Sequence, residues 1–105
     1  SKIEVKTVKL DNIVNKNIKL LKLEAEGAEP EILQGAINSL DKIEYISADL
    51  GFERGKDSES TLVPVINFLT GNNFDLVEII LQVVYQKQNI FYLFFLSEHP
   101  IASLL

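Results

Sequence analysis

The sequence predicts an α/β fold, namely part of a doubly wound sheet that is mostly parallel and ends in an antiparallel hairpin. Short apolar runs alternate with stretches of helical apolar spacing, which is typical of parallel strands joined by crossover helices. Two apolar runs near the end of the chain are separated by a short polar segment, which indicates a hairpin. The 105 residues are enough for one small domain, so we expect residues 1–105 to form a single domain.

Five segments have the composition of strands: residues 3–8, 18–23, 43–50, 75–85 and 90–96. The segment Ile18 to Leu23 is mostly apolar, as a strand buried in a parallel sheet is. The segment Asp75 to Tyr85 has polar residues at helical spacing, but its Val, Ile and Tyr content favours a strand. The polar residues 86–89 predict the turn of the final hairpin.

Two segments predict helices. The first begins at Pro30, which suits the first turn of a helix, and its apolar residues form one stripe that should face the sheet: Ile32, Leu33, Ala36, Ile37 and Leu40. The second follows Ser58 or Ser60, either of which can cap it, and ends at Gly71.

Bulk properties exclude several classes of protein. The net charge of −5 argues against a nucleic-acid binder, which needs clustered cations. The longest apolar run, Ile90–Leu96, is far shorter than the roughly 20 residues of a membrane helix, so we expect no membrane partner. The absence of cysteine excludes disulfides and cysteine-based zinc sites and fits a cytoplasmic location, which we expect. We predict no metal site.

Acidic residues gather where two predicted strands end. Glu24 and Glu26 follow the strand 18–23, and Asp49 lies at the end of the strand 43–50. Ligands of open parallel sheets sit outside the carboxyl ends of the strands. A carboxylate there can accept a proton from a substrate hydroxyl, but acidic residues before a helix also occur for electrostatic reasons alone.

The stretch 21–36, LKLEAEGAEPEILQGA, carries a motif. It resembles the signature of FkbM-family, S-adenosylmethionine-dependent methyltransferases, in which Lys-Ile-Asp, Val-Glu-Gly-Ala-Glu and Leu-x-Gly-Ala follow one another. Residues 8–12 and 71–74 resemble flanking segments of that family, so the resemblance runs over nearly the whole chain. Glu24 stands where the family has Asp, and Asp49 stands where a Glu often ends the next strand.

This resemblance implies a Rossmann-like methyltransferase fold, of which the chain would be the C-terminal half. It implies catalytic roles for Glu24, Glu26 and Asp49, S-adenosylmethionine as cofactor, and a hydroxyl of a sugar or small metabolite as methyl acceptor. Asp11 would approach the adenine, although ordinary N-capping explains it as well. The five glycines are too scattered to form the Gly-rich loop that binds the cofactor in the other half, so we expect the isolated chain to be inactive.

Two alternatives remain open, namely a non-catalytic interaction module and an excised structural domain with the same half-fold. In a half-sheet the strand Ile18–Leu23 would have a bare edge. Bare edges invite self-association, and we therefore expect a homodimer through this edge.

Overall fold

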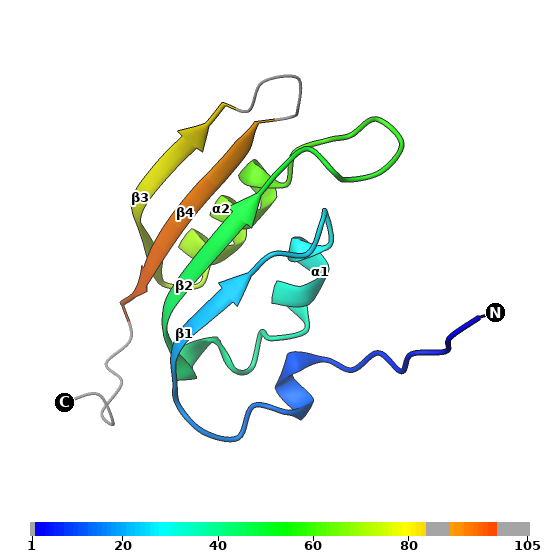
Figure 1. The fold of residues 1–105 in the computed structure, drawn as a ribbon. Helices are drawn as coiled ribbons and strands as arrows, with labels where there is room; N and C mark the ends of the chain where they lie inside the picture. Colours follow the sequence, from blue (N-terminus) through cyan, green and yellow to red (C-terminus); the bar gives the residue numbers. More distant parts are fainter. Residues whose placement is uncertain (1, 84–88, 99–105) are drawn as a thin grey trace.

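The structure is a computed structural model that describes residues 2–83 and 89–98, and it has a four-stranded mixed sheet (Figure 1). The strands are β1 (Ile18–Leu23), β2 (Ile43–Leu50), β3 (Phe74–Gln82) and β4 (Ile90–Ser97). Their order in the sheet is β1-β2-β4-β3. Two α-helices, α1 (Glu29–Gln34) and α2 (Leu62–Gly71), and two short 3₁₀ helices, η1 (Leu10–Asn12) and η2 (Leu40–Lys42), complete the described part.

The prediction of a mostly parallel, doubly wound sheet is wrong. Only β1 and β2 pair in parallel, whereas β4 pairs antiparallel with both β2 and β3. The reason lies in the hairpin, because β4 returns into the gap beside β2 and thereby keeps β3 from pairing with β2. The two α-helices contact each other, and Figure 1 shows α2 crossing behind β2 and β4. The molecule is therefore a small mixed sheet with helices on one face.

Burial alternates along the central strands as this one-sided arrangement requires. Ile46 and Ala48 of β2 are fully buried, as is Phe95 of β4, which pairs with Ile46. Side chains of opposite parity, such as Tyr45 and Ser47, are only partly buried, because they lie on the face without helices. The buried core contains Leu23, Leu33, Ala36, Leu40, Ile43, Ile46, Ala48, Leu50, Val65, Leu69, Phe74, Leu93 and Phe95.

Four of the five predicted strands are confirmed, and the one over residues 3–8 is wrong. That segment is extended without strand pairing, and Ile3 is 87% exposed. Alternation alone predicted the strand, but a strand also needs a neighbour to bond with. Most of the predicted turn 86–89 lies outside the described residues. Among the described residues, no helix is both long and apolar enough to cross a membrane.

The first helix is shorter than predicted, because the N–H groups of Ala36 and Ile37 donate three residues back, to Leu33 and Gln34, rather than four. The backbone N–H of Asp11 donates to the carbonyl of Gly35 at 2.9 Å, and Ser39 N–H donates to Ala36 instead. α1 therefore ends at Gln34, and the chain continues in tighter turns to η2. Leu33, Ala36 and Leu40 of the predicted stripe are still buried, whereas Ile37 is 44% exposed.

The start of α2 also differs in detail from the prediction. Its N-cap residue is Thr61 rather than a serine, although Ser60 Oγ accepts a hydrogen bond from Leu62 N–H at 3.1 Å. Thr61 directs its hydroxyl elsewhere, toward the loop that follows β1. The predicted end at Gly71 is confirmed.

Candidate functional site

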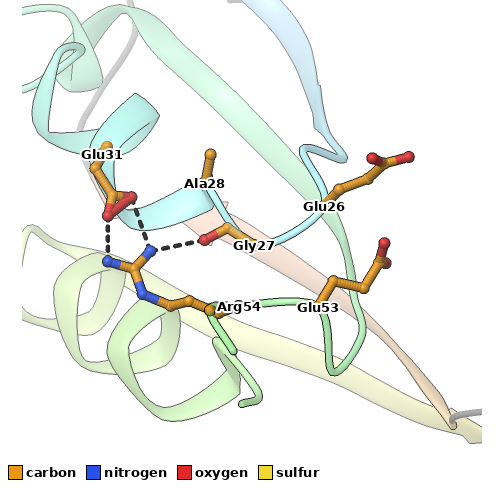
Figure 2. Close-up of a pocket in the computed structure, with 7 residues that line it drawn as sticks. Glu26, Gly27, Ala28, Glu31, Glu53 and Arg54 are labelled. Carbon is orange, nitrogen blue, oxygen red and sulfur yellow. Dashed lines mark hydrogen bonds and ion pairs between the residues drawn. The ribbon is translucent and has the colours of Figure 1, made fainter. Parts of the chain in front are cut away.

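Two loops meet beyond the carboxyl ends of the parallel strands and line a shallow, open pocket of about 430 Å³. The first loop, residues 24–28, connects β1 to α1, and the second, residues 51–61, connects β2 to α2. The pocket is lined by Glu26, Gly27, Ala28, Glu31, Glu53, Arg54 and Gly55 (Figure 2). We refer to it as the loop pocket.

Glu29 holds the first loop in place through hydrogen bonds to its backbone. It is the first residue of α1, and only 1% of it is exposed. Its Oε2 accepts hydrogen bonds from Ala25 N–H at 2.8 Å and from Gly27 N–H at 3.2 Å. Its Oε1 accepts one from Thr61 Oγ1 at 2.8 Å. A single buried carboxylate therefore ties the loop after β1 to the N-terminal end of α2.

Gly27 allows the two loops to touch. Its φ of +103° lies in a region that favours glycine. A Cβ atom at this position would lie 2.9 Å from Arg54 Cα and 3.0 Å from the Glu53 carbonyl oxygen, which are both backbone atoms. The preceding residue, Glu26, also has a positive φ, of 50°, so the loop makes a left-handed bend that presents the Glu26 side chain outward.

Arg54 holds the second loop against the first. Its guanidinium donates to the carbonyl of Gly27 at 2.7 Å and to both carboxylate oxygens of Glu31 (Figure 2). The hydrogen bond from Arg54 is the main cause that lowers the pKa of Glu31. Figure 2 shows Glu26 and Glu53 on the other side of the pocket, away from this ion pair. One side of the loop pocket is therefore formed by the ion pair of Arg54 and Glu31, whose charges cancel, and the other side by the exposed carboxylates of Glu26 and Glu53.

Glu24 and Asp49 belong to a different surface, the face of the sheet without helices. Leu23 pairs with Ala48, and both are buried toward the helices. Continuing this register by one residue places Glu24 beside Asp49, both on the opposite face. Lys22, on the same face, has its Nζ 3.9 Å from Asp49 Oδ2. The structure thus brings Glu24 and Asp49 to one corner of the sheet, and it places Glu26 in the loop pocket.

Asp11 lies at the other end of the parallel strands. Its carboxylate accepts hydrogen bonds from Ser39 Oγ at 2.6 Å and from Asn38 N–H at 3.2 Å. Ser39 precedes β2 by only four residues, so this contact lies at the amino end of the strands, whereas the loop pocket lies at the carboxyl end. The hydrogen bond from Ser39 is the main cause that lowers the pKa of Asp11. The adenine contact of Asp11 stays a prediction that this placement does not favour.

Sequence reasoning missed the residues that build the pocket, above all Glu29, Arg54 and Thr61. Glu29 lies in the first turn of α1, where the helix dipole favours an acidic residue, and nothing in the sequence indicates that it is buried. One signal for Arg54 was present, because it is the only arginine in the sequence and directly precedes a glycine in the loop after β2. Within the described residues, no group of three or more His, Asp or Glu side chains is arranged to hold a metal ion.

Comparison with known families decides the assignment. The family model of the methyltransferase FkbM domain matches residues 1–86 of the 105. The chain belongs to this family. The match to the FkbM family covers both loops of the pocket, β1, β2, both helices and β3, and it supports a methyltransferase-type function. No curated protein and no solved structure gives a significant match.

Proposed function

We propose that this FkbM-family chain takes part in S-adenosylmethionine-dependent methylation of a hydroxyl group on a sugar or another small metabolite. The observation that carries the proposal is the family match over residues 1–86. The position of the loop pocket supports it, because open sheets bind ligands beyond the carboxyl ends of their parallel strands.

The exposed carboxylates of the loop pocket suit ligands that carry several hydroxyl groups or a positive charge. Glu26 and Glu53 offer exposed carboxylate oxygens, which accept hydrogen bonds from ribose or sugar hydroxyls and from an ammonium group. In the proposal, Glu26 and Glu53 bind such groups of the cofactor or the acceptor. S-adenosylmethionine would supply the activated methyl group. Glu29 and Arg54 would keep the two loops at a fixed separation, since methyl transfer depends chiefly on alignment.

Glu24 and Asp49 are the proposed proton acceptors, for an acceptor that extends from the loop pocket to the corner of the sheet where they lie. A carboxylate at this corner would accept the proton of the acceptor hydroxyl. Lys22 Nζ lies 3.9 Å from Asp49 Oδ2, and the Lys22 side chain is 65% exposed. Asp49 is the better protected of the two acids, because it is only partly exposed whereas Glu24 is fully on the surface.

We further propose that the chain alone binds the cofactor weakly and does not catalyse methyl transfer. The reason is that its scattered glycines do not form a Gly-rich loop that could bind the cofactor. Calorimetric titration with S-adenosylmethionine should give a Kd of about 1 mM, and Glu26→Gln should weaken binding further. Formation of methylated product from labelled cofactor and a panel of sugars would contradict the second half of this proposal. A Kd that Glu26→Gln leaves unchanged would contradict the first.

The alternative is a non-catalytic interaction module that kept the fold. The feature that favours it is Glu24, which stands where the family has the shorter Asp. A cofactor titration with no heat at millimolar concentration would favour this alternative. The expected cytoplasmic location stays a prediction.

A further inference from the structure

We propose that β3 is a self-association edge, through which two copies of the chain pair antiparallel about a two-fold axis at Ile80. This proposal is independent of the methyltransferase reaction. It begins from the position of β3, which is the outermost strand of the sheet in the described part of the chain (Figure 1). An edge strand directs about half of its peptide N–H and C=O groups away from the sheet, where another strand can bond to them.

β3 exposes apolar side chains on both of its faces, although Glu78 and Gln82 flank Ile80 on the face without helices. Ile79 pairs with the buried Leu93 and lies on the helix side, whereas Ile80 pairs with Tyr92 and lies on the opposite side. The exposed apolar residues of this region, with their exposed fractions, are Val77 (57%), Ile79 (47%), Ile80 (52%), Leu81 (49%) and Val83 (74%). The exposed stripe of Ile79 and Leu81 on the helix side, with Ile80 on the other face, adjoins an open strand edge, and such an exposed apolar surface indicates a covered edge.

The sequence of β3 is compatible with a second copy of itself. A bulge at Leu76/Glu78 leaves the stretch 78–82 as regular strand. Antiparallel pairing centred on Ile80 uses all of that stretch, and it sets Ile79 opposite Leu81 and Glu78 opposite Gln82 of the second copy. The oxygen of the Gln82 amide already accepts a hydrogen bond from Tyr92 Oη at 2.8 Å, so the amide NH₂ is the group that Gln82 offers to the carboxylate of Glu78.

The other edge of the sheet is less compatible with a second copy. β1 carries a lysine on each of its faces, Lys19 on one and Lys22 on the other. Lysines are a common means of protecting an edge from pairing. We therefore place the dimer on β3 rather than on β1, the edge that the sequence suggested.

The experiment compares two lysine substitutions at matched positions. Ile80 on β3 and Leu20 on β1 are both 52% exposed, and both lie on the face without helices. Sedimentation equilibrium of the wild type from about 10 µM to about 1 mM should show mass rising toward the dimer, as for an interface smaller than the standard size. Ile80→Lys should weaken the dimer at least about tenfold, since it sets two ammonium groups opposite each other on the axis. Leu20→Lys should associate as the wild type does.

A wild type that stays monomeric over the whole range overturns the proposal, as does a Leu20→Lys variant that loses the dimer to the same extent as Ile80→Lys. Circular dichroism of both variants checks that they fold. Cysteine variants give a second measurement that does not depend on added charge, because the chain has no cysteine. Under mild oxidation Ile80→Cys should form a covalent dimer faster than Leu20→Cys, and an equal or reversed order of rates overturns the pairing at Ile80.

Discussion

The hydroxyl of Thr61 donates a hydrogen bond of 2.8 Å to Oε1 of Glu29, and this buried contact joins the N-cap of α2 to the first residue of α1, 32 residues earlier in the sequence. The other oxygen of Glu29 accepts from the backbone of the loop that contains Glu26. The position of Glu26 therefore depends on a carboxylate that does not itself face the pocket. Glu29 is a structural support of the candidate site.

The first prediction concerns this support. Glu29→Ala leaves two backbone N–H groups and the Thr61 hydroxyl without their acceptor, and it should lower the free energy of unfolding by about 3 kcal/mol. Glu29→Gln should cost only about 1 kcal/mol, because the amide oxygen can serve the two N–H groups while the Thr61 hydroxyl reverses and accepts from the amide NH₂. Urea unfolding of the two variants and the wild type measures both values. Equal losses for Ala and Gln would contradict the hydrogen-bonding role.

The second prediction concerns the contact between the loops. Gly27→Ala combines an unfavourable φ with a Cβ atom 2.9 Å from the backbone of Arg54, and it should lower the free energy of unfolding by about 2–3 kcal/mol. Gly55→Ala is the matched control, because Gly55 also has a positive φ, of 70°, but a Cβ atom there would meet nothing within 4 Å. It should cost about 1 kcal/mol. Thermal unfolding of the two variants compares them, and a control as damaging as Gly27→Ala would show that the close approach is unimportant.

The third prediction concerns acid stability. The pKa of Asp11 lies below its ordinary value of 3.8 in the folded chain, chiefly because Ser39 donates to its carboxylate. A group whose folded pKa is depressed stabilises the fold above its unfolded pKa, and this contribution disappears as the pH falls through the folded pKa. The wild type should therefore be more stable than Asp11→Asn at neutral pH, and the difference should shrink as the pH falls through the lowered pKa of Asp11.

Urea midpoints measured from about pH 7 to about pH 2.5 test this dependence on Asp11. Asp41→Asn provides a control on η2, where Asp41 is exposed. The control should leave the urea midpoint at neutral pH close to that of the wild type. A stability difference between wild type and Asp11→Asn that persists unchanged at the acid end would contradict the assignment.

Local patterns in the sequence predicted most elements correctly, because the strands and α2 have their own apolar periodicity. The pairing of the sheet was not predictable in the same way, since the insertion of β4 between β2 and β3 depends on contacts between segments far apart in sequence. The length of α1 was not predictable either, because the N–H groups of Ala36 and Ile37 donate three residues back rather than four. A periodic pattern indicates which residues prefer burial, but it does not indicate which N–H group will donate to a given backbone carbonyl.

The candidate site was predictable in outline only. The motif and the rule for open sheets located Glu24, Glu26 and Asp49 near the carboxyl ends of the strands, and the structure divides them between the sheet corner and the loop pocket. Nothing in the spacing of the sequence revealed that Glu29 would be buried or that Arg54 would bridge the loops. Their roles arise from the close approach of two loops, which only the folded chain shows.

The central claim is that the loop pocket is the ligand site of this methyltransferase-family chain. Amide-shift NMR during titration with S-adenosylmethionine tests it most directly. We predict shifts confined to residues 24–28 and 53–55, weakened in Glu26→Gln, with the amides of residues 38–39 beside Asp11 unchanged. Shifts absent at millimolar cofactor, or centred on residues 38–39, would contradict the claim.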